Sequence, residues 1–167
     1  MSLRHTYTRR QTTTINVPPP TVEHLLRNEP ATFLRIGKLR IVEQISREEE
    51  RAEWRGACEG GGGGGGAVRI DGSTVSEAMG IPFAPPVTFS TRWNATGKAV
   101  EWTSQAALRV CVRNVLTVTE HQGKANLHEE AVLQCPTILL PLVKYAFDRN
   151  HAQLHKAFKA HLEEEQT

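Results

Sequence analysis

The sequence has almost no net charge, because 20 Lys and Arg residues face 18 Asp and Glu residues and leave a formal charge of +2. Proteins that bind nucleic acid or anionic membranes through a long-range field carry a clear excess of positive charge. We therefore expect no nucleic-acid partner. The hydrophobic fraction of 39% and the charged fraction of 23% are ordinary for a globular chain, and 167 residues predict a single domain over 1–167.

A long apolar run is also missing, since no stretch approaches the ~20 residues of a membrane-spanning helix. We expect no integral membrane association and no secretory signal. The acid-free start "MSLRHTYTRRQTTTINV" weakly resembles a mitochondrial transit peptide. We prefer a cytoplasmic protein in which residues 1–9 can be disordered and "TTTINV" forms a first strand that ends at the prolines 18–20.

Cysteine is scarce and lacks the paired spacing of metal or redox motifs: Cys58, Cys111 and Cys135 lie far apart. We interpret them as thiols, which suits a reducing compartment. Asp148 and two histidines, His151 and His155, have spacings that a metal could use, but the helical pattern assigns them to a solvated face beside Lys144. We expect no metal and no other cofactor.

Glycine is concentrated in one run, Gly60–Gly66. Phosphate-binding loops need spaced glycines followed by Lys-Ser/Thr or a helix start, and "AVRIDG" offers neither. The run therefore predicts a flexible loop insertion over residues 60–80.

The rest of the chain shows clear periodicity. "TVEHLLRN" predicts a short helix behind Thr21, and "KLRIVEQIS" with "RAEWRGACE" predicts a hairpin. Four alternating segments predict antiparallel strands, with turns at "ATGK" and at Gln122-Gly123. The end of the chain predicts a long amphipathic helix from about Leu140. Its apolar stripe is Leu139, Leu142, Val143, Ala146, Phe147, Leu154, Ala157 and Phe158.

The order strand, short helix, antiparallel strands and long helix resembles the START-like superfamily, also called SRPBCC. The segment "LHEEAVLQCPTILLPLVKYAFDRNHAQLHKAF" is most similar to the end of small fungal members. The resemblance implies an α+β helix-grip fold, in which a curved antiparallel sheet wraps around the C-terminal helix. It also implies a cavity between them for an apolar or amphipathic ligand.

Three polar residues occupy positions where the periodic pattern predicts apolar residues, namely Asn114, Glu129 and Asn150. A buried carboxylate with a raised pKa would equip Glu129 as a general acid or as an anchor for a ligand hydroxyl. Alternatively, a β-bulge would turn Glu129 or Glu130 toward water. The resemblance adds an expected ligand lining of Phe89, Trp102, Leu142, Val143 and Ala146.

These observations favour a binding or carrier protein for a hydrophobic or amphipathic small molecule, such as a lipid, a sterol or a polyketide-like compound. A second hypothesis is a cyclase or dehydratase in which Glu129 is the acid/base and Asn114 or Asn150 orients the substrate. A third is an interaction module with a filled core. Because fold does not determine function, these hypotheses are separated by the geometry of the site.

Overall fold

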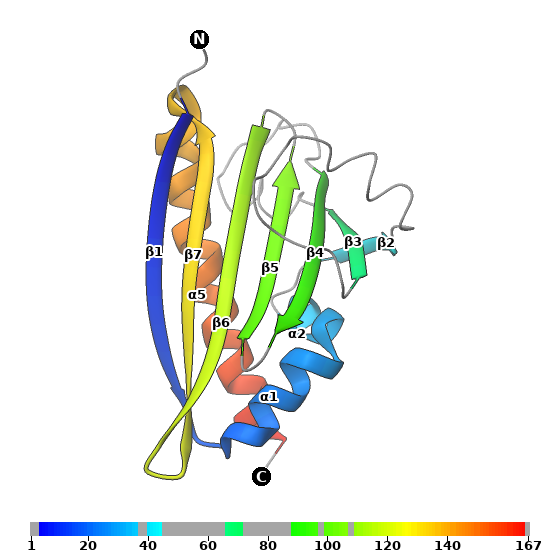
Figure 1. Ribbon diagram of the computed structural model, residues 1–167, viewed down its shortest axis with the longest axis vertical. Coiled ribbons are helices and arrows are strands. Elements are labelled where there is room, and N and C mark those ends of the chain that lie inside the picture. The colour runs from blue at the N-terminus through cyan, green and yellow to red at the C-terminus, as the bar shows by residue number, and fades with distance from the viewer. Residues whose placement is uncertain are drawn as a thin grey trace.

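The computed structural model of the protein describes residues 4–36, 40–44, 66–71, 88–96, 99–106 and 109–165. The fold is α+β, as expected, with an antiparallel sheet, a short helix after the first strand and a long C-terminal helix (Figure 1). The elements are β1 (Arg4–Ile15), α1 (Pro19–Asn28), α2 (Pro30–Ile36), β2 (Arg40–Gln44), β3 (Gly66–Asp71), β4 (Thr88–Thr96), β5 (Ala99–Ala106), β6 (Val110–His121), β7 (Lys124–Pro136), a 3-10 turn (Thr137–Leu139) and α5 (Leu140–Glu164).

The described strands form one antiparallel sheet in the order β1-β7-β6-β5-β4-β3-β2. Strands β2 to β7 follow one another as neighbours, and β1 joins the free side of β7. The predicted turn between β6 and β7 is confirmed, with positive φ angles of 53° at Gln122 and 76° at Gly123. Two successive positive φ angles match the right-handed twist of a hairpin, which explains the glycine at the second position.

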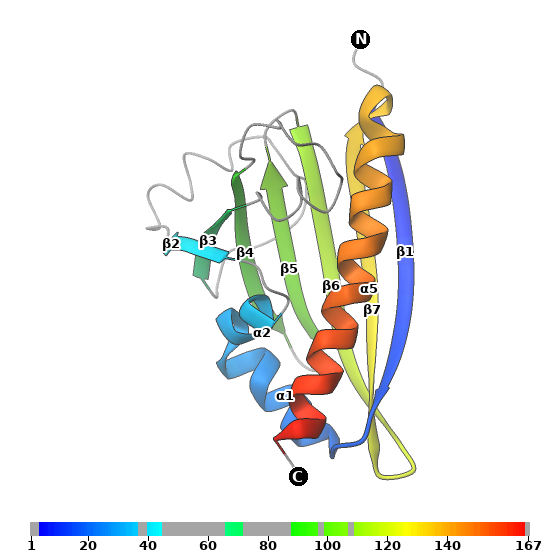
Figure 2. The same ribbon diagram turned by 180° about the vertical axis from the view of Figure 1, so that it is seen from behind.

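Helix α5 lies against one face of the sheet, over β1 and β7, and α1 and α2 lie near its C-terminal end (Figure 2). The expected start of α5 near Leu140 is confirmed, with Pro141 in the first turn, where its missing N–H costs little. None of the described helices is both long and apolar enough to cross a membrane.

The buried apolar residues fall into two clusters. The first lies where α1, α2 and the C-terminal half of α5 meet the sheet: Ile15, Val17, Val22, Leu25, Leu26, Phe33, Val100, Trp102, Leu116, Val118, Ala125, Leu127, Phe158 and Leu162. The second lies near the start of α5: Val110, Ala131, Leu133, Cys135 and Phe147. Along β7 and α5, the polar residues Glu129, His151 and His155 lie between residues of the first cluster and residues of the second.

The starts of strand β1 and helix α1 differ from expectation. Strand β1 begins at Arg4, so disorder over residues 1–9 is wrong for residues 4–9, and residues 1–3 lie outside the described part. All twelve residues of β1 pair with β7, which explains the order. Helix α1 begins at Pro19 rather than after Thr21, because two prolines are well suited to a first helical turn. Helix α2 was not predicted.

In the middle of the chain, strand β2 pairs with β3, and the segment expected to pair with β2, within residues 51–58, lies outside the described residues. Strand β3 falls inside the loop expected over residues 60–80, which corrects that expectation, and the remainder of the loop is not described.

The cysteines require a correction too. Cys111 is disulfide-bonded, whereas Cys135 is a buried free thiol. The expectation of three thiols is therefore wrong, and the inference of a reducing compartment loses that support.

Candidate functional site

The strand register places the predicted polar residues on the face of the sheet that α5 covers. Trp102 on β5 is paired with Asn114 on β6, and Asn114 with Ala131 on β7. In the next inward-facing row, Leu116 is paired with Glu129, which is paired with Gln11 on β1. Pairing through β6, β7 and β1 has no register shift here, so a β-bulge does not turn Glu129 to water. The residue is only 3% exposed.

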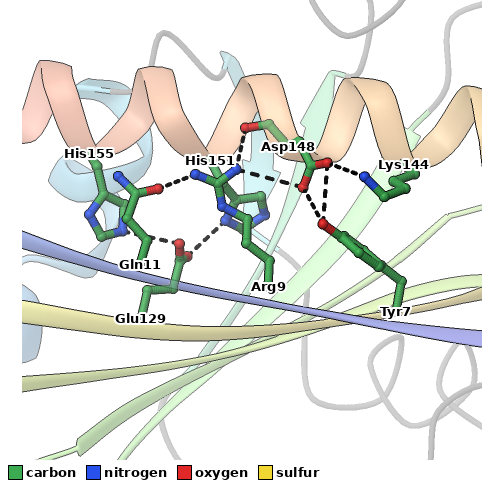
Figure 3. A network of polar contacts seen from close by, with 8 residues as sticks. All are labelled: Tyr7, Arg9, Gln11, Glu129, Lys144, Asp148, His151 and His155. Atoms are coloured by element: carbon green, nitrogen blue, oxygen red, sulfur yellow. Dashed lines mark hydrogen bonds and ion pairs between the residues drawn. The ribbon is translucent and has the colours of Figure 1, made fainter.

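Two histidines of α5 reach across to this carboxylate (Figure 3). His151 Nδ1 lies 2.8 Å from Glu129 Oε1, and His155 Nε2 lies 3.1 Å from Glu129 Oε2. The atoms of the second contact are not aligned for a hydrogen bond. On its other side, His155 Nδ1 is 2.8 Å from Thr13 Oγ1 on β1. Glu129, His151, His155 and Thr13, hereafter the Glu129 network, thus connect β1, β7 and α5.

The electrostatics of Glu129 differ from expectation. Burial by itself would raise the pKa of the carboxyl group, because the charged form loses hydration. The contacts with His151 and His155 together outweigh burial and lower the pKa of Glu129 to about 2. The raised pKa that a glutamic acid needs to donate a proton near neutral pH is therefore absent.

The assignment of His151 and His155 to a solvated face was wrong. His151 is 9% exposed and His155 is 1% exposed. At 3.6 residues per turn, each lies about 20° from the direction of buried Leu162, on opposite sides of it. Leu142 points about 160° away from the same direction and is 45% exposed. Helical spacing thus contained the signal, but the polar residue type concealed it.

A second group of polar atoms lies beside the network. Trp102 is 2% exposed, yet its Nε1 donor has no hydrogen-bond partner among the described residues. The Oδ1 acceptor of Asn114, at the directly opposed position on β6, is likewise buried and without such a partner. Opposed side chains on adjacent antiparallel strands have Cβ atoms about 5 Å apart, so the two side chains are neighbours on this face of the sheet.

The other residues of the expected lining are scattered. Ala146 is buried, and Val143 packs against the second apolar cluster. Asn150 is half-buried. Phe89 lies in β4, paired with Ile70 of β3, and its side chain lies outside the described part of the structure. The structure therefore brings Trp102, Asn114 and Glu129 to one face, and it places Leu142 away from them.

Sequence reasoning also missed a cluster at the edge of the interface (Figure 3). Asp148 on α5 accepts hydrogen bonds from Tyr7 Oη at 3.1 Å and from Lys144 Nζ at 2.7 Å. Arg9 on β1 donates to the backbone carbonyl of Asp148 at 2.6 Å and to Gln11 Oε1. Burial would raise the pKa of Asp148, but Lys144, Tyr7 and Arg9 outweigh it and lower the pKa. This cluster fastens β1 to α5.

Within the described ranges, no group of three or more His, Cys, Asp and Glu residues is arranged to hold a metal ion.

No family model matches the chain, and no curated protein matches its sequence. Solved structures do match it. Zhui aromatase/cyclase from Streptomyces sp. R1128 has a TM-score of 0.66 at 13% identity, covering 98% of this chain and 97% of that chain. A START superfamily protein from Mycobacterium smegmatis has a TM-score of 0.61 at 10% identity, with coverages of 94% and 97%. The chain has a START-like fold. Norcoclaurine synthase from Thalictrum flavum also shares it, with a TM-score of 0.61, 10% identity and coverages of 95% and 87%.

Proposed function

We propose that the protein binds a hydrophobic or amphipathic small molecule, such as a lipid, a sterol or a polyketide-like compound, between the sheet and helix α5. The observation that carries the proposal is the opposed pair of buried polar atoms, Trp102 Nε1 and Asn114 Oδ1, without partners in the described part of the chain. Leaving a buried donor or acceptor unpaired costs about 1–3 kcal/mol. A ligand that satisfies both atoms recovers this cost when it binds.

The two atoms restrict the polar end of the ligand. The indole N–H only donates a hydrogen bond, and the amide oxygen of Asn114 only accepts one. A hydroxyl group can accept from Trp102 and donate to Asn114 at the same time. Trp102 belongs to the larger apolar cluster, and ligand sites typically combine apolar walls with few placed polar groups. An apolar molecule that ends in a hydroxyl group fits both requirements.

The structural neighbours support the proposal only through the fold. One is named an aromatase/cyclase and another norcoclaurine synthase, so this fold is used by proteins that act on organic small molecules. Fold-level likeness does not fix function. Phe89, Val143, Ala146 and Asn150 remain proposed members of the lining. Leu142 remains a proposed member of the lining only at the rim of the ligand site, since this residue is 45% exposed. The likeness to small fungal members likewise remains a hypothesis.

Native mass spectrometry of the purified protein, followed by extraction of any small molecule, tests the proposal. We expect an adduct that is released on unfolding, or one that forms after incubation with a panel of sterols, fatty alcohols and aromatic polyketides. A mass that stays that of the free protein throughout would contradict binding and favour an interaction module with a filled core.

A matched pair of variants then tests the site. Trp102→Phe removes the indole N–H and keeps an aromatic ring, and we expect ligand affinity to fall about tenfold, the equivalent of one lost hydrogen bond. Trp93→Phe makes the same change one strand away, where the two indole rings have centroids 5.6 Å apart. Equal losses in both variants would show that the Trp102 N–H does not recognise the ligand.

An enzymatic role is the second candidate, and the buried Glu129 network is the observation that favours it. The original form of this hypothesis, with Glu129 as the acid/base, is weakened by the lowered pKa of about 2. At neutral pH the carboxylate is ionised and can only accept hydrogen bonds. Any proton that moves in this site must therefore be carried by another group of the network.

A further inference from the structure

We propose that His151 is the general base of the site: it removes a proton from the bound molecule, and Glu129, His155 and Thr13 are positioning residues that hold it in place. The inference rests on the proposed function, because it requires a small molecule between the sheet and α5. His151 thereby takes the place of Glu129 as the group that carries the proton. Both His151 and His155, which the sequence pattern assigned to a solvated face, gain a role.

Exposure within the network singles out His151. The side chains of Glu129 and His155 are each 1% exposed, whereas that of His151 is 11% exposed. Among the three titratable members of the network, His151 is thus the one that a small molecule can reach. Its ring lies against Phe147, with ring centroids 4.3 Å apart, so the accessible edge is bordered by an apolar surface. A base flanked in this way meets its substrate with little competing water.

The contact to Glu129 determines which nitrogen can act. An ionised carboxylate only accepts hydrogen bonds, so His151 Nδ1, 2.8 Å from Glu129 Oε1, must carry the hydrogen. The lone pair of the neutral ring then lies on Nε2, on the far side of the ring from Glu129. The carboxylate also stabilises the imidazolium that forms when Nε2 takes a proton. This is the base and orienter arrangement of other histidine-dependent sites.

His155 and Thr13 hold the carboxylate from its other side. His155 Nε2 is 3.1 Å from Glu129 Oε2, and Thr13 Oγ1 is 2.8 Å from His155 Nδ1. Because Thr13 and Glu129 stand on paired strands, the helix and the sheet are fixed relative to each other at this point. Glu129 therefore cannot rotate away from His151 without breaking the contact to His155. Such support from surrounding groups keeps a catalytic side chain in its productive geometry.

A nitrobenzisoxazole is a suitable probe, since its ring opening needs only one base in an apolar site. His151 Nε2 would take the proton from the ring carbon, the C–H electron pair would form the nitrile, and the N–O bond would break to release a cyanonitrophenolate. Water then removes the proton from Nε2. No oxidant, reductant or cofactor takes part, and the coloured product is followed by absorbance.

We expect the protein to accelerate this reaction over free imidazole with saturation in the probe, and His151→Asn to lose about 100-fold, the lower end of what a general base contributes. The control is His161→Gln, which alters a histidine of the same helix whose partner, Glu165 at 3.4 Å, is 61% exposed. This control should keep the wild-type rate. Equal rates in wild type and His151→Asn would overturn the inference.

The split between kcat and KM separates a positioning role from a merely structural one. Glu129→Gln keeps the size of the side chain and removes the carboxylate that accepts from His151 Nδ1. We expect kcat for the probe to fall about tenfold while KM stays unchanged, because the orientation of the base acts on the chemical step and not on binding. A kcat that is unchanged in Glu129→Gln would contradict the orienting role.

Binding and chemistry are measured separately, by displacement of an anilinonaphthalene sulfonate dye in wild type and in each variant. If neither dye nor probe binds wild type, the proposed function fails and this inference fails with it. If the probe displaces the dye but reacts no faster than with free imidazole, only the base assignment fails. Should His151→Asn not fold, the kcat and KM of Glu129→Gln, compared with those of wild type, still decide the question.

Discussion

The two halves of helix α5 contact the sheet in different ways. In the C-terminal half, Phe158 and Leu162 are 0% and 1% exposed and belong to the larger apolar cluster with α1 and α2. In the N-terminal half, Ile138 just before the helix and Tyr145 within it are 89% and 59% exposed. Between them lies the Glu129 network. The C-terminal half of α5 therefore supplies packing energy, whereas the middle of the helix supplies buried polar groups.

The largest expected effect concerns the packed half. Phe158→Ala removes a side chain that is fully buried against Phe33, with ring centroids 4.9 Å apart. We expect the free energy of unfolding to fall by about 3–5 kcal/mol, because transfer energy is lost and a cavity remains. Urea unfolding measures this. Tyr145→Ala, on the exposed half, is the control and should change stability by less than about 0.5 kcal/mol. Similar losses of stability in both variants would show that these two positions of the helix do not differ in packing energy.

The second effect concerns the polar middle. The pKa of Glu129 is lowered from 4.5 to about 2, so the folded state holds the ionised form more tightly than the unfolded state does. This contribution is complete above about pH 4.5 and is lost as the pH falls through about 2. A shift of this size corresponds to about 3 kcal/mol. Unfolding measured from pH 6 to 2 should therefore show a shallower loss in Glu129→Gln than in wild type.

The matched control for this experiment is Glu164→Gln, an exposed carboxyl at the end of the same helix. Its pH dependence should follow that of wild type. A slope for Glu129→Gln that equals that of Glu164→Gln would show that the network does not couple ionisation to folding.

A smaller effect is expected at the edge where β1 meets α5. Asp148→Asn keeps the size of the side chain and removes the charge that pairs with Lys144 at 2.7 Å and Arg9 at 3.6 Å. The side chain of Asp148 is 30% exposed, so solvent screens these pairs in part. We expect a loss of about 1 kcal/mol in thermal unfolding at low salt. Glu165→Gln should cost less, and an equal cost would argue against a fastening role for Asp148.

The smallest effect is expected on the outer face of the sheet. Arg113 Nε lies 2.8 Å from Glu101 Oε1, and this contact raises the pKa of Arg113. The side chains are 50% and 26% exposed, and surface pairs of this kind contribute about 0.2–1 kcal/mol. Glu101→Gln should lower stability within that range at low salt and by almost nothing in 1 M salt, where screening is short-ranged. A loss that persists in high salt would show another cause.

Much of the fold could be predicted because it depends on local periodicity. Alternation of apolar residues marked β4 to β7, and the Gln122-Gly123 turn marked their last hairpin. Helix α2 was missed because Pro30–Ile36 is only seven residues long and shows less than two helical turns of pattern. The partner predicted for β2 lies within residues 51–58, outside the described residues. The pairing of β2 with β3 was not predicted, since strand pairing depends on the whole sheet.

The site was predicted in part. Parity along β6 and β7 correctly placed Asn114 and Glu129 on the inner face, because side chains alternate strictly along a strand. The partners of Glu129 were missed, since histidine in an amphipathic helix was assigned to the polar face by residue type instead of by angle. The lowered pKa of Glu129 could not be predicted without these two histidines, because burial alone raises the pKa of a carboxyl group.

By itself, the sequence determined the START-like order of elements, the inward parity of Glu129 and Asn114, and the start of the closing helix. These features follow from interactions between residues close in the chain, namely alternation, helical spacing and turn chemistry. Only the tertiary structure decided that His151 and His155 meet Glu129, and that Trp102 Nε1 and Asn114 Oδ1 are both buried without a hydrogen-bond partner among the described residues. The residues of these pairs lie 12 to 26 positions apart, and their energies depend on burial, which no local pattern specifies.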